Sequence, residues 1–71
     1  MIPVQFINKK TGKQYFFSFD KNLYIGQITK FVSDYISNIK IRFFYYTQEI
    51  FPNNNKITVD MIDKEIHFQV D

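Results

Sequence analysis

The stretch from Ile41 to Tyr46 constrains the fold most, because branched and aromatic side chains with one charge among them favour a strand. A strand in a sheet with one buried face turns alternate side chains toward the core. The residues predicted to face inward are Ile41, Phe43 and Tyr45. The opposite side then carries Arg42, Phe44 and Tyr46. Aromatic residues and Arg are enriched in recognition surfaces, so this side is either a binding surface or a second packing layer.

The 71 residues are expected to form a single domain, 1–71, near the size at which one core barely outweighs chain entropy. The chain has no cysteine for a disulfide or a thiolate metal site, and its one histidine, His67, cannot form a histidine cluster. Stability must therefore come from the core, for which nine Phe and five Tyr supply large apolar areas.

The net charge of +2 is too small to indicate nucleic-acid binding. Lys9, Lys10 and Lys13 do cluster, but around a turn, where a solvated hairpin tip is the simpler interpretation. No apolar run reaches membrane-spanning length, and the first five residues do not resemble a signal peptide. We therefore expect the protein in the cytoplasm or nucleus.

Two segments near the N-terminus alternate as strands, one around Val4-Gln5-Phe6 and one from Gln14 to Asp20. Their expected inward residues are Ile2, Val4, Phe6, Tyr15, Phe17 and Phe19. The segment between them is rich in turn residues, and Gly12 there is expected to supply a positive φ. The two strands are therefore predicted to form a hairpin.

The period changes to steps of three and four after Asn22, which predicts an amphipathic helix of about four turns. Its apolar side consists of Ile25, Ile28, Val32, Tyr35, Ile36 and Ile39, and its polar side of Gln27, Thr29, Lys30, Ser33, Asp34 and Ser37. We expect Asn22 as the N-cap and Asn38 as the left-handed terminator. Gly26 is expected to weaken the helix by about 1 kcal/mol relative to Ala, and Phe31, off the stripe, to be partly exposed.

The third strand is predicted to end at Tyr46, and a tight connection at Thr47-Gln48 leads to a short fourth strand, Glu49-Ile50-Phe51. Residues 57–62 are expected to be irregular with a short helical turn. The last strand is predicted at Ile66–Val70, with Ile66, Phe68 and Val70 inward and His67 and Gln69 outward. This order predicts an α+β fold, a β-grasp roll with strand order 2-1-5-3-4 and one helix on one face of the sheet.

Several strings resemble ubiquitin and the ubiquitin-like domains. Thr11-Gly12-Lys13 matches three residues of ubiquitin's first turn, Arg42-Phe43-Phe44-Tyr45 is similar to its Arg-Leu-Ile-Phe strand, and Ile66-His67-Phe68 to its Leu-His-Leu. Apolar positions that match its core are Ile25, Ile28, Val32, Ile57 and Ile62. The resemblance spans essentially the whole chain with few identities, and it implies the same β-grasp fold.

Two departures from the family pattern matter. The sequence has no Gly-Gly and ends Phe68-Gln69-Val70-Asp71, so a non-conjugated domain is expected; a Gly-Gly beyond Asp71 would reverse that expectation. Alignment on Thr-Gly-Lys would also turn Gln5 inward, whereas alternation turns Val4 and Phe6 inward. Alternation is preferred, because burying Gln5 would cost several kcal/mol.

The resemblance implies a docking patch on the solvent face of the sheet. Phe44 takes the position of ubiquitin's central Ile, His67 that of its His, Gln69 that of its Val, and Lys10 or a neighbour that of its turn Leu. The other residues expected to contribute are Ile7, Phe16, Arg42 and Tyr46. Such a patch accepts apolar side chains from a short partner helix, and Arg42 can pair with partner carboxylates.

Little in the sequence indicates catalysis. His67 is expected on an open sheet face with no pocket, and Asp60, Asp63 and Glu65 lack the spacing of a calcium loop. We therefore expect no enzyme, no metal and no cofactor.

The resemblance implies a monomeric interaction domain that docks to helical ubiquitin-receptor modules of proteasomal, deubiquitinating or AAA-segregase machinery. Two alternatives remain. One is a Ras-association-like or scaffold domain that binds through the edge of its second strand, at Gln14, Phe16 and Ser18. The other is a structural subunit of an assembly, such as a viral one, with its aromatic face buried.

Overall fold

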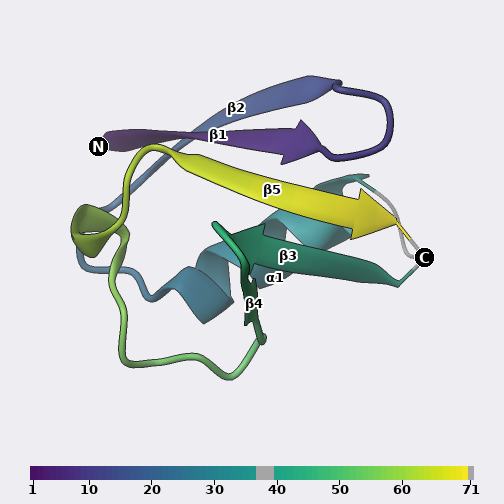
Figure 1. Cartoon of the computed structure of the whole chain (residues 1–71). Helices are drawn as coiled ribbons and strands as arrows, with labels where there is room; N and C mark the ends of the chain where they lie inside the picture. The colour runs from purple at the N-terminus through teal and green to yellow at the C-terminus, as the bar shows by residue number, and fades with distance from the viewer. Residues whose placement is uncertain (37–39, 71) are drawn as a thin grey trace.

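A computed structural model describes residues 1–36 and 40–70 of the chain. A five-stranded sheet with strand order β2-β1-β5-β3-β4 carries one helix on one face (Figure 1). The elements are β1 (Ile2–Asn8), β2 (Gln14–Phe19), α1 (Ile25–Ile36), β3 (Ile41–Tyr45), β4 (Gln48–Ile50), the 3-10 helix η1 (Val59–Met61) and β5 (Glu65–Val70). The central strands β1 and β5 are parallel and the other neighbours antiparallel. The α+β class and the β-grasp topology are therefore confirmed.

The hairpin of β1 and β2 follows the alternating pattern. Val4 pairs with Phe17 and Phe6 with Tyr15 across the two strands. Val4 and Phe6 are buried, whereas Gln5 is only half-buried, so alternation was the correct guide to the register. Gly12 has a φ of 77° in the connecting turn, as predicted.

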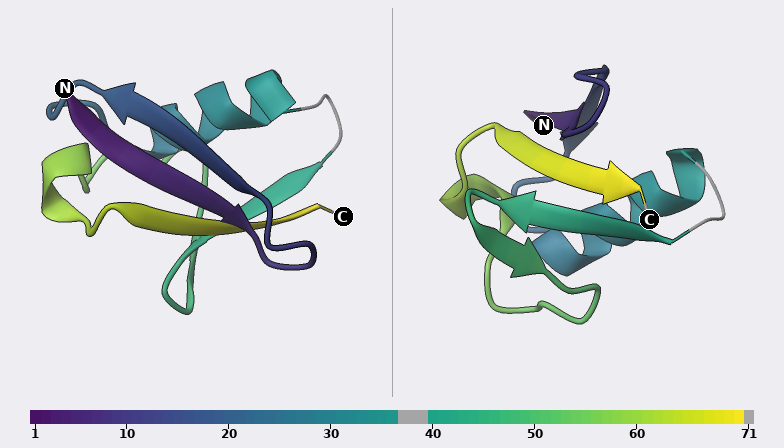
Figure 2. Two further views of the ribbon diagram at one scale, coloured as in Figure 1. Left: turned by 90° about the horizontal axis from the view of Figure 1, so that it is seen from above. Right: turned by 45° about the vertical axis from the view of Figure 1, so that its right-hand side comes forward.

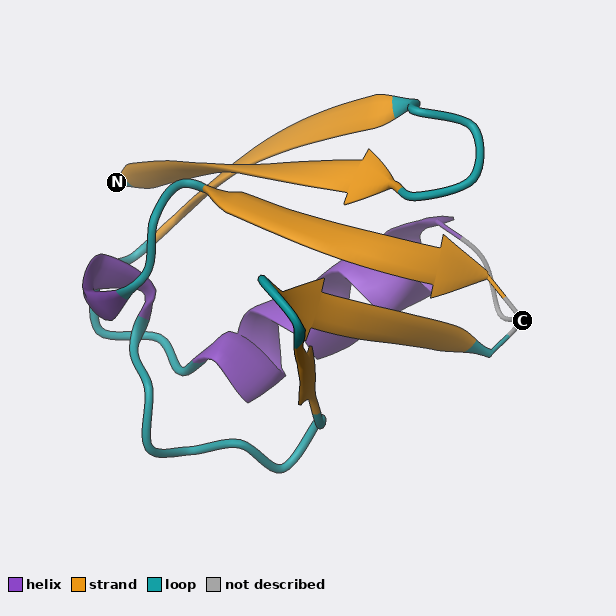
Figure 3. Ribbon diagram, viewed as in Figure 1, coloured by secondary structure: helices purple, strands orange, loops and turns teal. Residues whose placement is uncertain are grey.

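The core lies between the sheet and α1, which covers one side of the sheet (Figures 2 and 3). Phe6 is fully buried at its centre. Its ring meets those of Phe17, Phe19 and Phe43 edge-on, with centroid distances of 5.9, 6.4 and 5.9 Å. The helix contributes Ile25, Ile28 and Val32 to this cluster. Edge-to-face aromatic pairs add stability beyond the area that they bury.

The start of α1 differs from the prediction of an Asn22 cap. The helix begins at Ile25, and the Asn22 N–H donates to Asp20 Oδ1 in the turn before it. The first helical N–H groups are satisfied from outside the helix, by the Ile57 carbonyl at 2.9 Å and the Asn54 carbonyl at 3.2 Å. Because the loop after β4 supplies these acceptors, an N-cap side chain at position 22 is unnecessary.

Gly26 is the residue that lets this loop approach the helix. A Cβ at position 26 would lie 2.5 Å from the Pro52 carbonyl oxygen and 2.6 Å from that of Asn54. These distances are below van der Waals contact, and both atoms belong to backbone. The expectation that Gly26 weakens the helix considered helix propensity alone and missed this close approach.

The apolar side of α1 is narrower than its periodicity suggested. Tyr35, expected inward, is 65% exposed and packs its ring on Phe17 at the margin of the sheet. Thr29, expected on the polar side, is buried, because its hydroxyl donates to the Gly26 carbonyl at 3.0 Å and so enters the core satisfied. Phe31 is partly exposed, as predicted. The predicted Ile39 and the Asn38 terminator lie outside the described residues.

The β3–β4 connection is shifted by one residue from the prediction. Tyr45 pairs with Gln48, so β3 ends at Tyr45 and β4 runs from Gln48 to Ile50. Tyr46 is the first loop residue and has a φ of 56°, a left-handed conformation that the sequence pattern did not anticipate. With β4 ending at Ile50, Phe51 is exposed.

The long loop before β5 closes over the start of α1. Its short helical turn, predicted within residues 57–62, is η1. Val59 is fully buried, and its N–H donates to the Leu23 carbonyl at 2.8 Å. In β5, Ile66 and Phe68 are buried as predicted, but Val70 near the chain end is exposed. In the described part of the chain, no helix has the length and apolar content needed to cross a membrane.

Candidate functional site

The sheet surface opposite α1 presents one row of side chains in register, which we call the outer row. Ile7 on β1 is the partner of His67 on β5, His67 is the partner of Phe44 on β3, and Phe44 is the partner of Glu49 on β4. Direct partners in neighbouring strands project from the same face of a sheet. Four strands thus bring two apolar side chains, an imidazole and a carboxylate together.

Phe44 is half-buried, because two cations lie over its ring. Lys9 Nζ is 4.4 Å from the ring centroid, and the Arg42 guanidinium carbon is 5.4 Å from it. A cation over an aromatic face is held by the ring quadrupole. The centre of the face is therefore an aromatic ring flanked by positive charge.

Arg42 also joins β3 to β4 through an ion pair with Glu49. Arg42 Nη2 lies 2.9 Å from Glu49 Oε1, and Nε lies 3.5 Å from Oε2. The hydrogen bond from Arg42 is the main reason that the pKa of the Glu49 carboxyl is below its usual range, with the charges of Arg42 and Lys40 acting in the same direction against partial desolvation. This pair orients the guanidinium beside Phe44.

A hollow of about 290 Å³ opens beside the outer row, between the start of β5 and the β3–β4 turn. The residues that line it are Lys9, Tyr46, Asp63, Glu65 and His67. His67 Nε2 lies 2.7 Å from Glu65 Oε1, so the imidazole is held against its own strand. The hollow therefore presents both signs of charge.

Tyr46 closes the turn end of this hollow. Its hydroxyl donates to the Asp63 carboxylate, and this hydrogen bond, with the negative charge of Asp63, raises the pKa of Tyr46 to about 12. The Asp63 N–H in turn donates to the Tyr45 hydroxyl at 2.9 Å. These contacts fasten the loop before β5 onto the β3–β4 turn. Tyr46 is a turn residue at the margin of the face, rather than the strand residue that the sequence predicted.

The structure brings most of the predicted patch together. His67 lies between Ile7 and Phe44 as the direct partner of each, and Arg42 and Gln69 are partners two residues further along β3 and β5. Lys10 lies in the hairpin turn, where it lines a surface hollow with Gln69. Phe16 is separate from this group. It lies on the edge strand β2, where its partner on β1 is Gln5, and both β1 and β5 lie between it and Phe44.

Lys9 contacts this face, although the sequence prediction named Lys10 or a neighbour for the turn position and did not single out Lys9. It follows the last residue of β1, and its N–H donates to the Phe68 carbonyl of β5 at 2.9 Å. This bond directs the side chain across β5 toward Phe44. A lysine next to Lys10 in a predicted turn carried no signal for such a contact, since the contact depends on the parallel pairing of β1 with β5.

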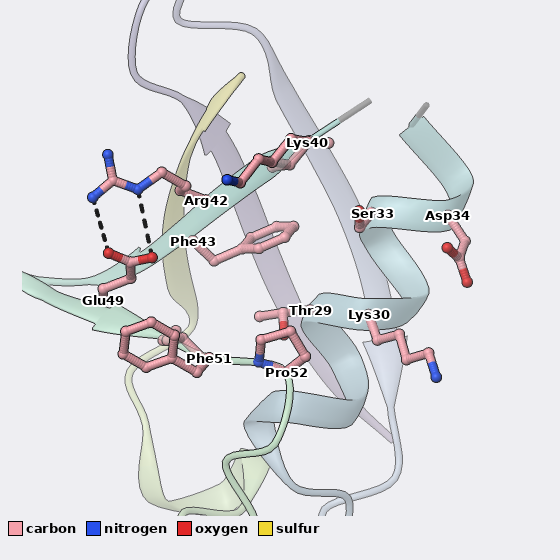
Figure 4. A pocket seen from close by; sticks show the side chains of 12 residues that line it. Thr29, Lys30, Ser33, Asp34, Lys40, Arg42, Phe43, Glu49, Phe51 and Pro52 are labelled. Carbon is pink, nitrogen blue, oxygen red and sulfur yellow. Dashed lines mark hydrogen bonds and ion pairs between the residues drawn. The ribbon is translucent and has the colours of Figure 1, made fainter. Parts of the chain in front are cut away.

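A larger groove, of about 510 Å³, lies on the other side of β3, between α1 and the strands β3 and β4 (Figure 4). Phe43, Phe51 and Pro52 line it from the strand side and Thr29 and Ser33 from the helix. The Arg42–Glu49 pair stands at its rim (Figure 4). Lys30, Asp34 and Lys40 also line it, so the groove combines an apolar floor with charged side chains. Among the described residues, no group of three or more His, Cys, Asp or Glu is arranged to hold a metal ion.

Comparison with family models and with curated proteins adds no relative. No family model matches the chain, and a search of curated proteins finds no match. The β-grasp topology therefore rests on the sheet order and on the placement of the helix between β2 and β3.

Proposed function

We propose that this chain is a ubiquitin-like protein-interaction domain that docks a helical partner, by non-covalent contact, on the outer row around Phe44. The observation that carries the proposal is the register of Ile7, His67 and Phe44 on three adjacent strands. Phe44 and His67 occupy positions that the resemblance to ubiquitin-like domains implicates in recognition, and Ile7 extends the same face.

The chemistry of the face favours a helix with apolar and acidic side chains. Phe44 offers an aromatic centre, while Lys9 and Arg42 place positive charge directly beside it. An amphipathic helix can lay apolar side chains on such a centre and direct carboxylates at the cations of the rim. The acidic side of the hollow, at Asp63 and Glu65, would disfavour the same helix in the reversed orientation.

The proposed partners are the helical ubiquitin-receptor modules of proteasomal, deubiquitinating and AAA-segregase machinery. With such partners, the domain would act in the cytoplasm or nucleus. The proposed role is that of an adaptor, in which one copy of the domain binds one partner helix without a cofactor and without a catalytic step.

The test is titration of the folded protein with isolated helical ubiquitin-receptor modules, followed by amide chemical shifts. Phe44→Ala is expected to weaken binding at least about tenfold, because truncation of a hot-spot aromatic residue at the centre of an interface costs about 2 kcal/mol or more. Phe51→Ala is the matched control, since Phe51 is an exposed Phe outside the outer row.

The amide spectrum of each variant establishes that it is folded. Wild-type affinity in Phe44→Ala would contradict the proposal. So would shift changes confined to Gln14, Phe16 and Ser18, which would indicate binding at the β2 edge instead.

A further inference from the structure

The two edges of the sheet differ in how they are protected. The β4 edge is three residues long and carries Glu49, which is paired with Arg42. The β2 edge is six residues long, from Gln14 to Phe19, contains no charged residue and no proline, and pairs with β1 in unbroken register. Charges, prolines, bulges and shortness are the features that stop an edge strand from pairing with another chain. The β2 edge has none of them.

The backbone groups that β2 presents outward follow from the neighbouring strands. The Gln5 N–H donates to the Lys64 carbonyl, on the side of β1 that faces β5. Its antiparallel partner Phe16 is therefore in a non-hydrogen-bonded pair with β1, and the N–H and C=O of Phe16 point away from the sheet. Gln14 and Ser18 share this orientation, because backbone direction alternates along a strand. Three residues thus offer paired donors and acceptors at the open edge.

Exposed aromatic rings stand on both faces beside this edge. Phe16 is 68% exposed on the face away from the helix. On the helix face, Phe31 is 52% exposed, and its ring meets the Phe17 ring edge-on with a centroid distance of 5.8 Å. The Tyr35 ring also packs on Phe17, with a centroid distance of 5.1 Å. A hollow of about 380 Å³ lies between β2 and α1, lined mainly by Phe17, Phe19, Leu23, Ile28 and Phe31.

We propose that the occupant of this edge is a second copy of the chain, paired antiparallel through β2 about a two-fold axis. A two-fold axis perpendicular to the sheet places the helix-covered faces of both copies on the same side. Each residue must therefore oppose a residue whose side chain points to the same face of the sheet. With Phe16 opposite Phe16 of the copy, Gln14 opposes Ser18, and all three outward-pointing residues exchange hydrogen bonds. Tyr15 then opposes Phe17 on the helix face. The two sheets would form one continuous sheet.

Charge at the ends of the strand favours a copy in this orientation. Lys13 precedes the uncharged stretch and Asp20 follows it. In this register Lys13 opposes Phe19 of the copy and lies one residue from Asp20 of the copy, twice, whereas a parallel arrangement would bring like charges together. The neutral strand between them adds no repulsion between identical chains.

The exposed area is that of a weak dimer. Aromatic side chains bury 150–250 Å² each when fully covered, so the exposed parts of Phe16, Phe31 and Tyr35 amount to roughly 300–400 Å² per copy. Both copies together offer roughly 600–800 Å² of aromatic surface, which is below the size of about 1,000 Å² that is usual for a stable specific interface. We therefore expect a weak dimer, with a dissociation constant on the order of 100 µM. This inference departs from the monomer that the sequence analysis predicted, and it does not depend on the proposed docking at Phe44.

Sedimentation equilibrium between about 10 µM and 1 mM tests the inference, because that range brackets the expected dissociation constant. The wild-type chain is expected to pass reversibly from monomer to dimer. Phe16→Lys places a charge at the two-fold axis and should raise the dissociation constant at least about tenfold. Gln48→Lys, the same charge on the β4 edge, should leave it unchanged. A wild-type chain that remains monomeric at 1 mM, or a Phe16→Lys variant that dimerises like the wild type, would overturn the inference.

Charge reversal tests the antiparallel orientation. Lys13→Glu alone and Asp20→Lys alone should each weaken the dimer, and the double variant should restore it, because opposite charges again lie one residue apart at the two ends of the paired strands. Failure of the double variant to recover would overturn this pairing. Because Asp20 Oδ1 also accepts the Asn22 N–H at 2.8 Å, amide spectra of each variant must show an intact fold. Phe44→Ala should dimerise normally, which separates this inference from the proposed function.

Discussion

Lys9 Nζ lies 4.4 Å from the centre of the Phe44 ring, although Lys9 follows β1 and Phe44 is on β3, with β5 between them. The lysine is anchored through its backbone N–H to Phe68 of β5, so its side chain crosses the central strand. The contact ties the hairpin to the other half of the sheet. It also sets the charge that an incoming partner meets at the centre of the outer row.

A double-mutant cycle measures this contact. Lys9→Met keeps the apolar stem and removes the charge, and its coupling with Phe44→Ala in the free energy of unfolding is expected to be about 0.5–1 kcal/mol. The control pair is Lys9→Met with Phe51→Ala, for which the urea unfolding free energies should add. Equal coupling in both pairs would show that the cation does not act through the Phe44 ring.

Gly26→Ala should destabilise the protein by about 1–3 kcal/mol, because the new Cβ would overlap two backbone carbonyls of the loop after β4. Helix propensity alone predicts the opposite sign, a gain of about 1 kcal/mol. Urea unfolding of Gly26→Ala measures the effect. Lys30→Ala serves as the control, since Lys30 is exposed on the same helix and should change stability little. A Gly26→Ala variant as stable as the wild type would contradict the close approach.

Tyr46 should ionise late in an alkaline titration. Its pKa is raised to about 12 because its hydroxyl donates to the Asp63 carboxylate. A raised pKa means that the hydrogen bond stabilises the folded state fully below the ordinary value of 10.0, and that this contribution is lost as the pH rises through about 12. Phenolate absorbance measured against pH reports this step.

Two variants assign the late step to Tyr46. Tyr46→Phe should remove it from the titration, and Asp63→Asn should move it toward the ordinary tyrosine range, because the negative charge is lost and a neutral amide oxygen is a weaker acceptor than a carboxylate. A late step that persists in Tyr46→Phe would belong to another tyrosine and would refute the assignment.

Glu49 is expected to give the opposite pH dependence of folding stability, in the acid range. Its pKa is lowered by the hydrogen bond from Arg42, so the pair stabilises the folded state above the ordinary carboxyl value of 4.5, and this contribution is lost as the pH falls through the lowered value. The difference in unfolding free energy between wild type and Glu49→Gln should therefore shrink on acidification below that range. Arg42→Gln should reduce the same pH dependence. A constant difference across the acid range would show that the ion pair has no effect on folding.

The topology and the core register were predictable because they depend on local periodicity. Alternation identified Val4, Phe6, Ile66 and Phe68 as core residues, and the three-to-four spacing identified Ile25, Ile28 and Val32. A side-chain pattern with a period of two or 3.6 determines which face is apolar, and burial of that face selects the register. Alternation also predicted that Phe44 faces outward, whereas its place at the centre of a docking patch was implied by the resemblance to ubiquitin-like domains.

The failures share a different cause. Gly26, Tyr46 and Lys9 are each defined by a segment distant in the chain: the loop at Asn54, the carboxylate of Asp63 and the ring of Phe44, respectively. Helix propensity and strand periodicity describe a residue and its immediate neighbours only, so they carry no information about these contacts. Phe16 was assigned to the patch from its outward orientation alone, whereas the strand order places it on the edge strand β2, on the same face but with two strands between it and β3.

The amino-acid sequence by itself thus determined the order of the elements, the apolar faces and the outward position of Phe44, because these follow from side-chain period and chain connectivity. Only the tertiary structure decided which outward residues become neighbours. The parallel pairing of β1 with β5 brings Ile7 and Lys9 to Phe44, and the same sheet order leaves β2, with Phe16, as an open edge. Contacts between strands distant in sequence depend on how the whole core closes.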